Sequence, residues 1–407
     1  MCGIAGIVRF DGAEVDSHLL HHMTDALSHR GPDGRGVYVD RSIGLGHRRL
    51  SIIDLSSAGQ QPMTSQDGRY TLVFNGEMYN FQQERRHLEG RGYSFRSSSD
   101  TEILLSLYQE YGEKCLERIQ GMFAFAVYDK DLQRIFLARD RVGKKPLKYF
   151  LHKGVFAFAS ELKALKILPE CPRSLDQEAL YHYLTLMYLP SSRTGVVGIE
   201  KLTAGHSMIV DIQRATIAQR KYWELRYTSL HQPLQTWKEQ VRSTFFAAVQ
   251  RRMVADVPVG AFLSGGLDSA AIVWAMTELG KSPVETFSIG TSIATHDELP
   301  YAAITAKKFG THHHPIVVEP NIVELLPELV RTYEEPYADP SLIPMYLLAR
   351  EARRSVTVAL NGDGGDENFC GYARYPILRF SRLWERMPGV LHSLANIGTT
   401  IFHRYAQ

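Results

Sequence analysis

The chain has 407 residues, with Lys+Arg 46 against Asp+Glu 44, so its net charge of +2 predicts neither a nucleic-acid partner nor a membrane surface. Its four cysteines, Cys2, Cys115, Cys171 and Cys370, have no CxxC spacing, which argues against a zinc knot or a disulfide framework. The N-terminus has no charged leader before an apolar run, and no apolar run is long enough to span a membrane, so we expect a cytoplasmic protein.

The first half of the chain alternates short β-rich runs with a few helical segments. We predict strands at 4–10, 70–75, 122–129, 134–139 and 155–160, and helices at 17–27 and 100–111. Asp100 is the expected N-cap of the second helix. Sheets covered by helices indicate an α+β domain, which we place at residues 1–215.

The second half, placed at residues 225–407, alternates strand with helix. We predict strands at 259–263, 284–289, 314–318 and 356–360, and helices at 270–279, 299–309 and 341–352. A βαβ series predicts an α/β domain with a parallel, doubly wound sheet. Ligands of such sheets bind at the carboxyl ends of the strands.

The second residue is a cysteine that becomes N-terminal if Met1 is removed. Cys2 would then carry both a thiol and a free α-amine, and an amine with a reference pKa of about 8 suits a base for the neighbouring thiol. Such a nucleophile needs no histidine partner. The alternative is that Cys2 is a small apolar residue at the start of a buried strand.

The sequence SGGLDS at 264–269 lies between a predicted strand and a predicted helix. Gly265 and Gly266 let the backbone approach a phosphate closely, and the hydroxyls of Ser264 and Ser269 add donors to the helix N-terminus. Asp268 is unusual in an anion site unless a Mg²⁺ ion bridges the phosphates. A structural glycine turn is the alternative, and the strand–turn–helix context favours the phosphate site.

A second loop, NGDGGDE at 361–367, follows another apolar run of β type. Its carboxylates stand at the end of a predicted strand, where they could supply a second metal ligand. A solvated acidic turn is the alternative interpretation.

Together these motifs carry a family likeness: residues 1 to about 375 resemble the glutamine-hydrolysing asparagine synthetases. In the first half the matching motifs are MCGIAGI at 1–7, HRGPDG at 29–34, GHRRLSIID at 46–54, FNGEMYN at 74–80, SSDTEILL at 98–105, ARDRVGKKPL at 138–147 and FASELKAL at 158–165. In the second half they are FLSGGLDSA at 262–270, FSIG at 287–290, YEEPYADPS at 333–341 and NGDGGDENFCGY at 361–372. The resemblance implies an N-terminal-nucleophile αββα sandwich of the class II glutamine amidotransferase type, followed by an α/β doubly wound ATP-pyrophosphatase domain.

In the first domain the resemblance implies that Cys2 attacks the glutamine side-chain amide and releases ammonia. The side-chain amide of Asn75 and the backbone N–H of Gly76 would form the oxyanion hole. The groups that hold glutamine would be Arg49 for its α-carboxylate, and Glu77 and Asp100 for its α-ammonium group.

In the second domain the resemblance implies that ATP converts the aspartate β-carboxylate into an adenylate, with pyrophosphate leaving. Ammonia would reach this adenylate through an internal channel and give asparagine. The residues expected to contact ATP are Leu263, Ser264, Gly265, Gly266, Asp268, Ser269, Ile289, Gly362 and Asp363, with Leu263 and Ile289 at the adenine. The expected Mg²⁺ ligands are Asp268 and Asp366.

The chain departs from the family pattern in length and at several positions. Family members continue well beyond the equivalent of Tyr372, so we expect exposed apolar surface on the synthetase domain. A truncated gene, a fragment, or a split enzyme completed by a second chain would each explain this length. The resemblance also implies a homodimer. Asn361, Lys148 and Glu334 stand where serine, tyrosine and aspartate are usual. The NGDGGDEN variant resembles a branch found with bacterial surface-polysaccharide clusters, so the alternatives are another carboxylate acceptor or a glutaminase-only, partner-dependent remnant.

Overall fold

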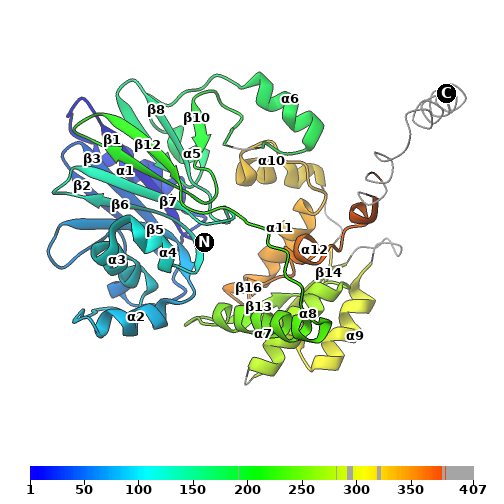
Figure 1. Ribbon diagram of the computed structural model, residues 1–407. Helices are drawn as coiled ribbons and strands as arrows, with labels where there is room; N and C mark the ends of the chain where they lie inside the picture. The colour runs from blue at the N-terminus through cyan, green and yellow to red at the C-terminus, as the bar shows by residue number, and fades with distance from the viewer. Residues whose placement is uncertain (191, 281, 291–296, 319–321, 378–380, 382–407) are drawn as a thin grey trace, which may run out of the picture.

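The computed structural model describes residues 1–190, 192–280, 282–290, 297–318, 322–377 and 381. They form two halves, and residues 222–233, which contain no helix or strand, connect them (Figure 1). The N-terminus lies on the side of the first half that faces the second (Figure 1). No helix in the described ranges combines the length and the apolar character needed to cross a membrane.

Two six-stranded antiparallel sheets form the centre of the first half. In spatial order, the first sheet contains β10 (Ile199–Lys201), β8 (Lys148–His152), β9 (Val155–Ala159), β1 (Gly3–Arg9), β3 (Ile43–Arg49) and β2 (Gly34–Asp40). The second contains β12 (Thr216–Lys221), β11 (His206–Asp211), β7 (Arg134–Arg139), β6 (Gly121–Asp129), β5 (Tyr70–Met78) and β4 (Met63–Thr64).

Alternation along the strands produces three buried layers in this half. Val8 of β1 and Val73 of β5 point into the layer between the two sheets. Their neighbours Ile7 and Phe74 point outward, against helices on opposite sides. The helices are α1 (Ser17–Asp25) and α5 (Leu162–Leu165) on the first sheet, α2 (Phe81–Glu89), α3 (Asp100–Tyr111) and α4 (Cys115–Arg118) on the second, and α6 (Gln177–Leu186) beyond. The predicted αββα sandwich is confirmed.

The second half contains a four-stranded parallel sheet with the spatial order β15 (His312–Val317), β14 (Glu285–Gly290), β13 (Val259–Phe262) and β16 (Val358–Leu360). Helices α7 (Leu234–Arg252), α8 (Leu267–Leu279) and α9 (Leu299–Phe309) cover one face of it. Helix α11 (Leu342–Ala352) covers the other, and α10 (Ile322–Tyr333) and α12 (Gly365–Phe369) complete the described elements. Cover on both faces confirms the predicted doubly wound α/β domain.

Several predicted limits change in the structure. Ser99, rather than Asp100, is the N-cap of α3, because its hydroxyl accepts the N–H of Thr101 while the Asp100 carboxylate accepts the N–H of Met78. The helix predicted at 270–279 begins at Leu267, and the strand predicted at 314–318 covers 312–317. The domain limits 1–215 and 225–407 stay a prediction, and β12 adds a strand to the first half just beyond residue 215.

Candidate active site

A cavity of about 390 Å³ lies where the first half faces the second. The residues expected to bind and cleave glutamine all line it: Cys2, Arg49, Asn75, Gly76, Glu77 and Asp100. They come from the start of β1, the end of β3, the second half of β5 and the first residue of α3. The sandwich therefore brings together side chains that are far apart in the sequence.

Two motifs hold the backbone of Cys2. Arg30 of HRGPDG donates to the Cys2 carbonyl at 2.8 Å and to Glu161 of FASELKAL at 2.8 Å. The Leu50 N–H points at the Cys2 sulfur, 3.4 Å away. Burial raises the pKa of the Cys2 thiol, so the thiol needs a base to become a nucleophile.

The candidate base is the amine at the chain terminus. Burial lowers the pKa of the Met1 amine to about 5, so the Met1 amine is neutral near pH 7. Removal of Met1 would make the amine of Cys2, the residue directly before β1, the chain terminus. A neutral amine beside the thiol can accept the proton of the thiol.

Asn75 is the oxyanion-hole candidate. Its side chain is 0% exposed, and within the described part of the chain neither its amide nitrogen nor its amide oxygen has a hydrogen-bond partner. Buried amides are almost always paired, so an unpaired one in a cavity wall suits a ligand that supplies the missing bond. A Cβ on the adjacent Gly76 would lie 2.4 Å from the Met122 carbonyl oxygen, so this close approach requires glycine.

The three groups expected around the glutamine backbone differ in charge and are all buried. Arg49 donates to the Ser56 carbonyl at 2.7 Å and also contacts the Asp54 carbonyl. Burial, together with the neighbouring Asp100 charge, raises the pKa of Glu77 to about 7, and burial raises that of Asp100 to about 6. One guanidinium and two carboxylates match an α-amino acid, which carries one carboxylate and one ammonium group.

The cavity also contains a lysine that the sequence analysis did not single out. Lys145 is 3% exposed and its Nζ lies 2.7 Å from the Met1 sulfur. Among the described residues no carboxylate lies within ion-pair distance of it, and burial lowers its pKa to about 8. Its place inside the motif GKKPL was the available signal, but the sequence could not show which of two adjacent lysines is buried.

The two loops expected to bind ATP meet at the switch point of the parallel sheet. SGGLDS follows β13 and NGDGGDE follows β16, and these strands are neighbours where the strand order reverses: α8 follows β13 on one face of the sheet, and α11 precedes β16 on the other. A Cβ on Gly362 would lie 2.9 Å from the Ser269 nitrogen, and one on Gly365 would lie 2.3 Å from the Asp268 carboxylate. Glycines at these positions let the second loop pack directly on the N-terminal end of α8.

Serine hydroxyls organise the first loop from inside. The hydroxyls of Ser264 and Ser269 lie 2.9 Å apart, and the Gly266 N–H donates to Ser264 Oγ at 3.2 Å. The Gly265 N–H donates to the Glu298 carboxylate at 3.1 Å. This loop therefore already binds an oxyanion through its backbone, which is the interaction that a pyrophosphate group needs.

The other expected ATP-site residues have mixed positions. Leu263 is buried in the core of its half, whereas Ile289 is only partly buried. Asp363 accepts a 2.6 Å hydrogen bond from the Asn361 side chain. The Asp366 carboxylate lies directly against Gly371, where an added Cβ would be 1.9 Å from its Oδ1. The described residues contain no cluster of three or more potential metal ligands. A Mg²⁺ ion carried by ATP uses one or two carboxylates plus phosphates, and Asp268 beside the 362–365 turn fits that need.

The cavity that contains Cys2 reaches the second half. Its remaining wall includes Thr357, Val358, Ala359 and Asn361, which belong to β16 and to the residues directly before and after it. The same strand therefore borders the Cys2 cavity and leads into NGDGGDE.

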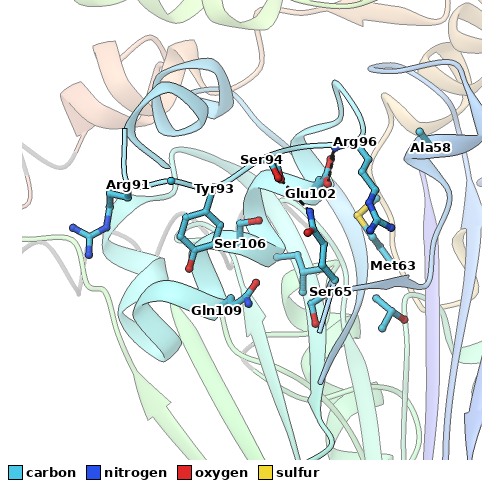
Figure 2. Close-up of a pocket in the computed structure, with 14 residues that line it drawn as sticks. Ala58, Met63, Ser65, Arg91, Tyr93, Ser94, Arg96, Glu102, Ser106 and Gln109 are labelled. Atoms are coloured by element: carbon cyan, nitrogen blue, oxygen red, sulfur yellow. Dashed lines mark hydrogen bonds between the residues drawn. The ribbon is translucent and has the colours of Figure 1, made fainter. Parts of the chain in front are cut away.

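A second cavity, of about 530 Å³, lies in the first half beside α3 (Figure 2). Arg91, Tyr93, Ser106 and Gln109 are among the residues that line it. None of the expected site residues lies in its wall, and it contains no cysteine. It is therefore not the site that the Cys2 geometry defines.

The two halves match separate families. Residues 1–223 match the glutamine amidotransferase domain, and residues 240–406 match the asparagine synthase family. With Cys2 at the start of β1 in an αββα sandwich, the first half belongs to the glutamine amidotransferases.

The chain as a whole belongs to the glutamine-hydrolysing asparagine synthetase family. It is 39% identical, over 91% of its length, to a Methanocaldococcus jannaschii protein whose name places it in that family, and it covers 76% of that protein. It is 35% identical to asparagine synthetase [glutamine-hydrolyzing] 1 of Bacillus subtilis, with 97% of this chain matched. The chain spans 62% of that relative's length. Among solved structures, a glutamine phosphoribosylpyrophosphate amidotransferase from B. subtilis aligns over 79% of this chain and 82% of its own, with 16% identity and a TM-score of 0.44.

Proposed function

We propose that the protein makes asparagine from aspartate, with glutamine as the nitrogen donor and ATP as the activating substrate. The observation that carries the proposal is the shared cavity, in which Cys2 and the β16 segment Thr357–Asn361 form parts of one wall. A glutaminase alone has no need to open its nucleophile toward a second domain. An enzyme that delivers ammonia to that domain needs such an opening, because ammonia that escaped into water would be protonated.

The glutamine half-reaction uses groups present in the cavity. The Cys2 thiol transfers its proton to the terminal amine and its sulfur attacks the amide carbon. Asn75 and Gly76 would stabilise the oxyanion while ammonia leaves, and water then hydrolyses the thioester to give glutamate. Arg49, Glu77 and Asp100 would hold the glutamine backbone throughout.

The second half-reaction would take place at the switch point. The aspartate β-carboxylate attacks the α-phosphorus of ATP, pyrophosphate leaves, and ammonia displaces AMP from the adenylate to give asparagine. Ser264–Ser269 would bind the pyrophosphate, with Gly362 and Asp363 beside it. Mg²⁺ held by Asp268 and Asp366 would neutralise phosphate charge.

Product analysis tests the proposal. Purified protein with glutamine, aspartate and ATP should form glutamate, asparagine, AMP and pyrophosphate in equal amounts. Cys2→Ala should abolish glutamate release and keep synthesis from ammonium salts. Glutamate release without AMP or pyrophosphate would instead identify a glutaminase-only protein. If AMP formed only with another carboxylic acid, that acid and not aspartate would be the acceptor.

We also infer a cytoplasmic protein that forms a homodimer or binds a second chain. Support comes from apolar side chains exposed along α10, namely Val323, Leu326 and Val330, which a partner would cover. Light scattering of the purified protein tests this, because a single chain has a mass of 46.0 kDa. A mass of one chain, unchanged at high concentration, would contradict the dimer.

A further inference from the structure

The loop after β3 contacts both the glutamine cavity and the second half of the molecule. Asp54, in this loop, is 7% exposed and has a positive φ of 56°, a conformation that side-chain-bearing residues rarely adopt. Aspartate adopts this conformation more readily than most side-chain-bearing residues, and the hydrogen bonds around Asp54 stabilise it.

Asp54 uses its carbonyl and its carboxylate to hold two parts of the glutamine cavity. Its carbonyl accepts a hydrogen bond from the Arg49 guanidinium. Its carboxylate accepts the N–H of Ser56 at 3.0 Å and the N–H of Ser98 at 2.8 Å. Ser98 directly precedes Ser99 and Asp100 at the start of α3, so Asp54 connects the carboxylate-binding side of the cavity to its ammonium-binding side.

The remaining backbone group of Asp54 is bound by the second half. Its N–H donates to Oδ2 of Asp256 at 2.8 Å, and the Asp256 N–H donates to the Ile52 carbonyl at 2.9 Å. Asp256 lies between α7 and β13, three residues before the strand that ends in SGGLDS. Two hydrogen bonds therefore tie the loop at 52–54 to the segment that leads into the phosphate loop.

We propose that Asp54 and Asp256 are positioning residues that set the affinity for glutamine and link it to the ATP half. Asp54 holds Arg49 and the Asp100 segment in register, and Asp256 fixes Asp54 from across the domain boundary. A shift of β13 when nucleotide binds would be transmitted through Asp256 to the glutamine ligands. This inference rests on the proposed binding of glutamine by Arg49 and Asp100.

Asp256 is the residue to change, because it is solvent-exposed and its loss does not open the core. Asp256→Ala removes the acceptor for the Asp54 N–H, and we expect KM for glutamine to rise about fivefold with kcat unchanged. Asp256→Asn keeps a side-chain oxygen acceptor and should restore the wild-type KM. Any change in glutamine KM on adding ATP and aspartate should be lost in Asp256→Ala.

The matched control is Arg251→Ala, which removes a different hydrogen bond between the halves, from Arg251 to Gln120 at 2.9 Å, near the same end of α7. Its KM for glutamine should equal that of the wild type. An unchanged KM in Asp256→Ala, an equal loss in Asp256→Asn, or an equal rise in Arg251→Ala would each overturn the inference.

Hydrogen–deuterium exchange separates this inference from the proposed function, because it needs no turnover. Amides of 50–58 and 97–101 should exchange faster in Asp256→Ala than in the wild type or in Asp256→Asn. If the wild-type protein hydrolyses no glutamine, the proposed function is contradicted. Hydrogen–deuterium exchange alone then decides whether the hydrogen bonds between Asp256 and the loop at 52–54 hold that loop. Equal exchange in all variants would show that Asp256 does not hold the loop.

Discussion

At the scale of single residues, the two buried carboxylates of the glutamine cavity predict a specific pH dependence. Glu77 and Asp100 have pKa values raised to about 7 and about 6, mainly by burial. In the proposed role they would bind the ammonium group of glutamine only when deprotonated, so glutamine binding should be complete well above pH 7 and be lost as the pH falls through 7 and 6. The fall of kcat/KM for glutamine at acid pH should therefore follow the titration of these two carboxylates. Glu77→Gln should remove the part of that fall that lies near pH 7. An acid limb near pH 4 would contradict this account.

The buried lysine beside Cys2 leads to a second prediction at this scale. The charge of Lys145 favours the Cys2 thiolate, so Lys145→Met should move the pH dependence of Cys2 alkylation by iodoacetamide upward by about one unit. Lys144→Met, at the exposed neighbouring lysine, should leave the alkylation profile unchanged. Identical profiles for both variants would show that Lys145 does not act on the thiol. Mass spectrometry of each protein should first establish that Met1 has been removed.

Sequence reasoning singled out the candidate nucleophile and its candidate partners but not how they are held. Cys2, Asn75 and Arg49 stand in motifs that can be recognised, and the structure places them in one cavity. The burial and the missing ion pair of Lys145 depend on tertiary packing around the cavity, which spacing does not encode. The choice of Ser99 over Asp100 as N-cap was also beyond the sequence, because both are good caps and the Met78 N–H decides between them.

At the scale of elements, the contact between the two glycine-rich loops should control the ATP half. Gly365→Ala would place a methyl group against the Asp268 carboxylate and push the loops apart. A displacement of this size typically costs about 100-fold in rate, so we expect ATP–pyrophosphate exchange to fall by about that factor while glutamine hydrolysis continues. Gly90→Ala, at an exposed helix end with space for a methyl group, is the matched control. Normal exchange in Gly365→Ala would show that this contact is not needed.

The predicted elements are those that alternation and flanking turns mark clearly, whereas strands β4, β8, β10, β11 and β12 and helices α2, α6, α7 and α10 were not predicted. The strand at 134–139 and the helix at 299–309 have the predicted limits. The edge strand β15 was misplaced by two residues at its start, since His312 and His313 interrupt the apolar pattern there. Strands β2 and β3 were not predicted, because their glycines conceal the alternation.

At the scale of the whole molecule, a buried ion-pair cluster joins the two halves. Lys148 of β8 lies 2.7 Å from Glu334 and 2.9 Å from Glu335, just after α10, and Glu334 also accepts the backbone N–H groups of Leu162 and Lys163. Sequence comparison marked Lys148 and Glu334 only as departures from the family. Their pairing depends on how the halves dock, which the sequence did not reveal.

Lys148→Met should leave both glutamates buried without their main cation. Breaking a buried pair typically costs about 3 kcal/mol, so we expect a clearly lower Tm and faster proteolysis of the connecting segment at 222–233. Lys130→Met, which removes an exposed contact to Asp40 at 3.7 Å, should change Tm little. Equal Tm values for the two variants would mean that the cluster does not stabilise the docked halves.

The central claim is that ammonia passes from Cys2 to the synthetase half without mixing with solvent. The most direct measurement supplies glutamine labelled with nitrogen-15 in its side-chain amide, aspartate, ATP and an excess of unlabelled ammonium. Mass spectrometry then determines how much of the asparagine carries the label. Asparagine should be mainly labelled, because the proposed route through the shared cavity would keep the released ammonia out of solvent. Asparagine that is mainly unlabelled, while glutamine is hydrolysed at the same rate, would contradict it.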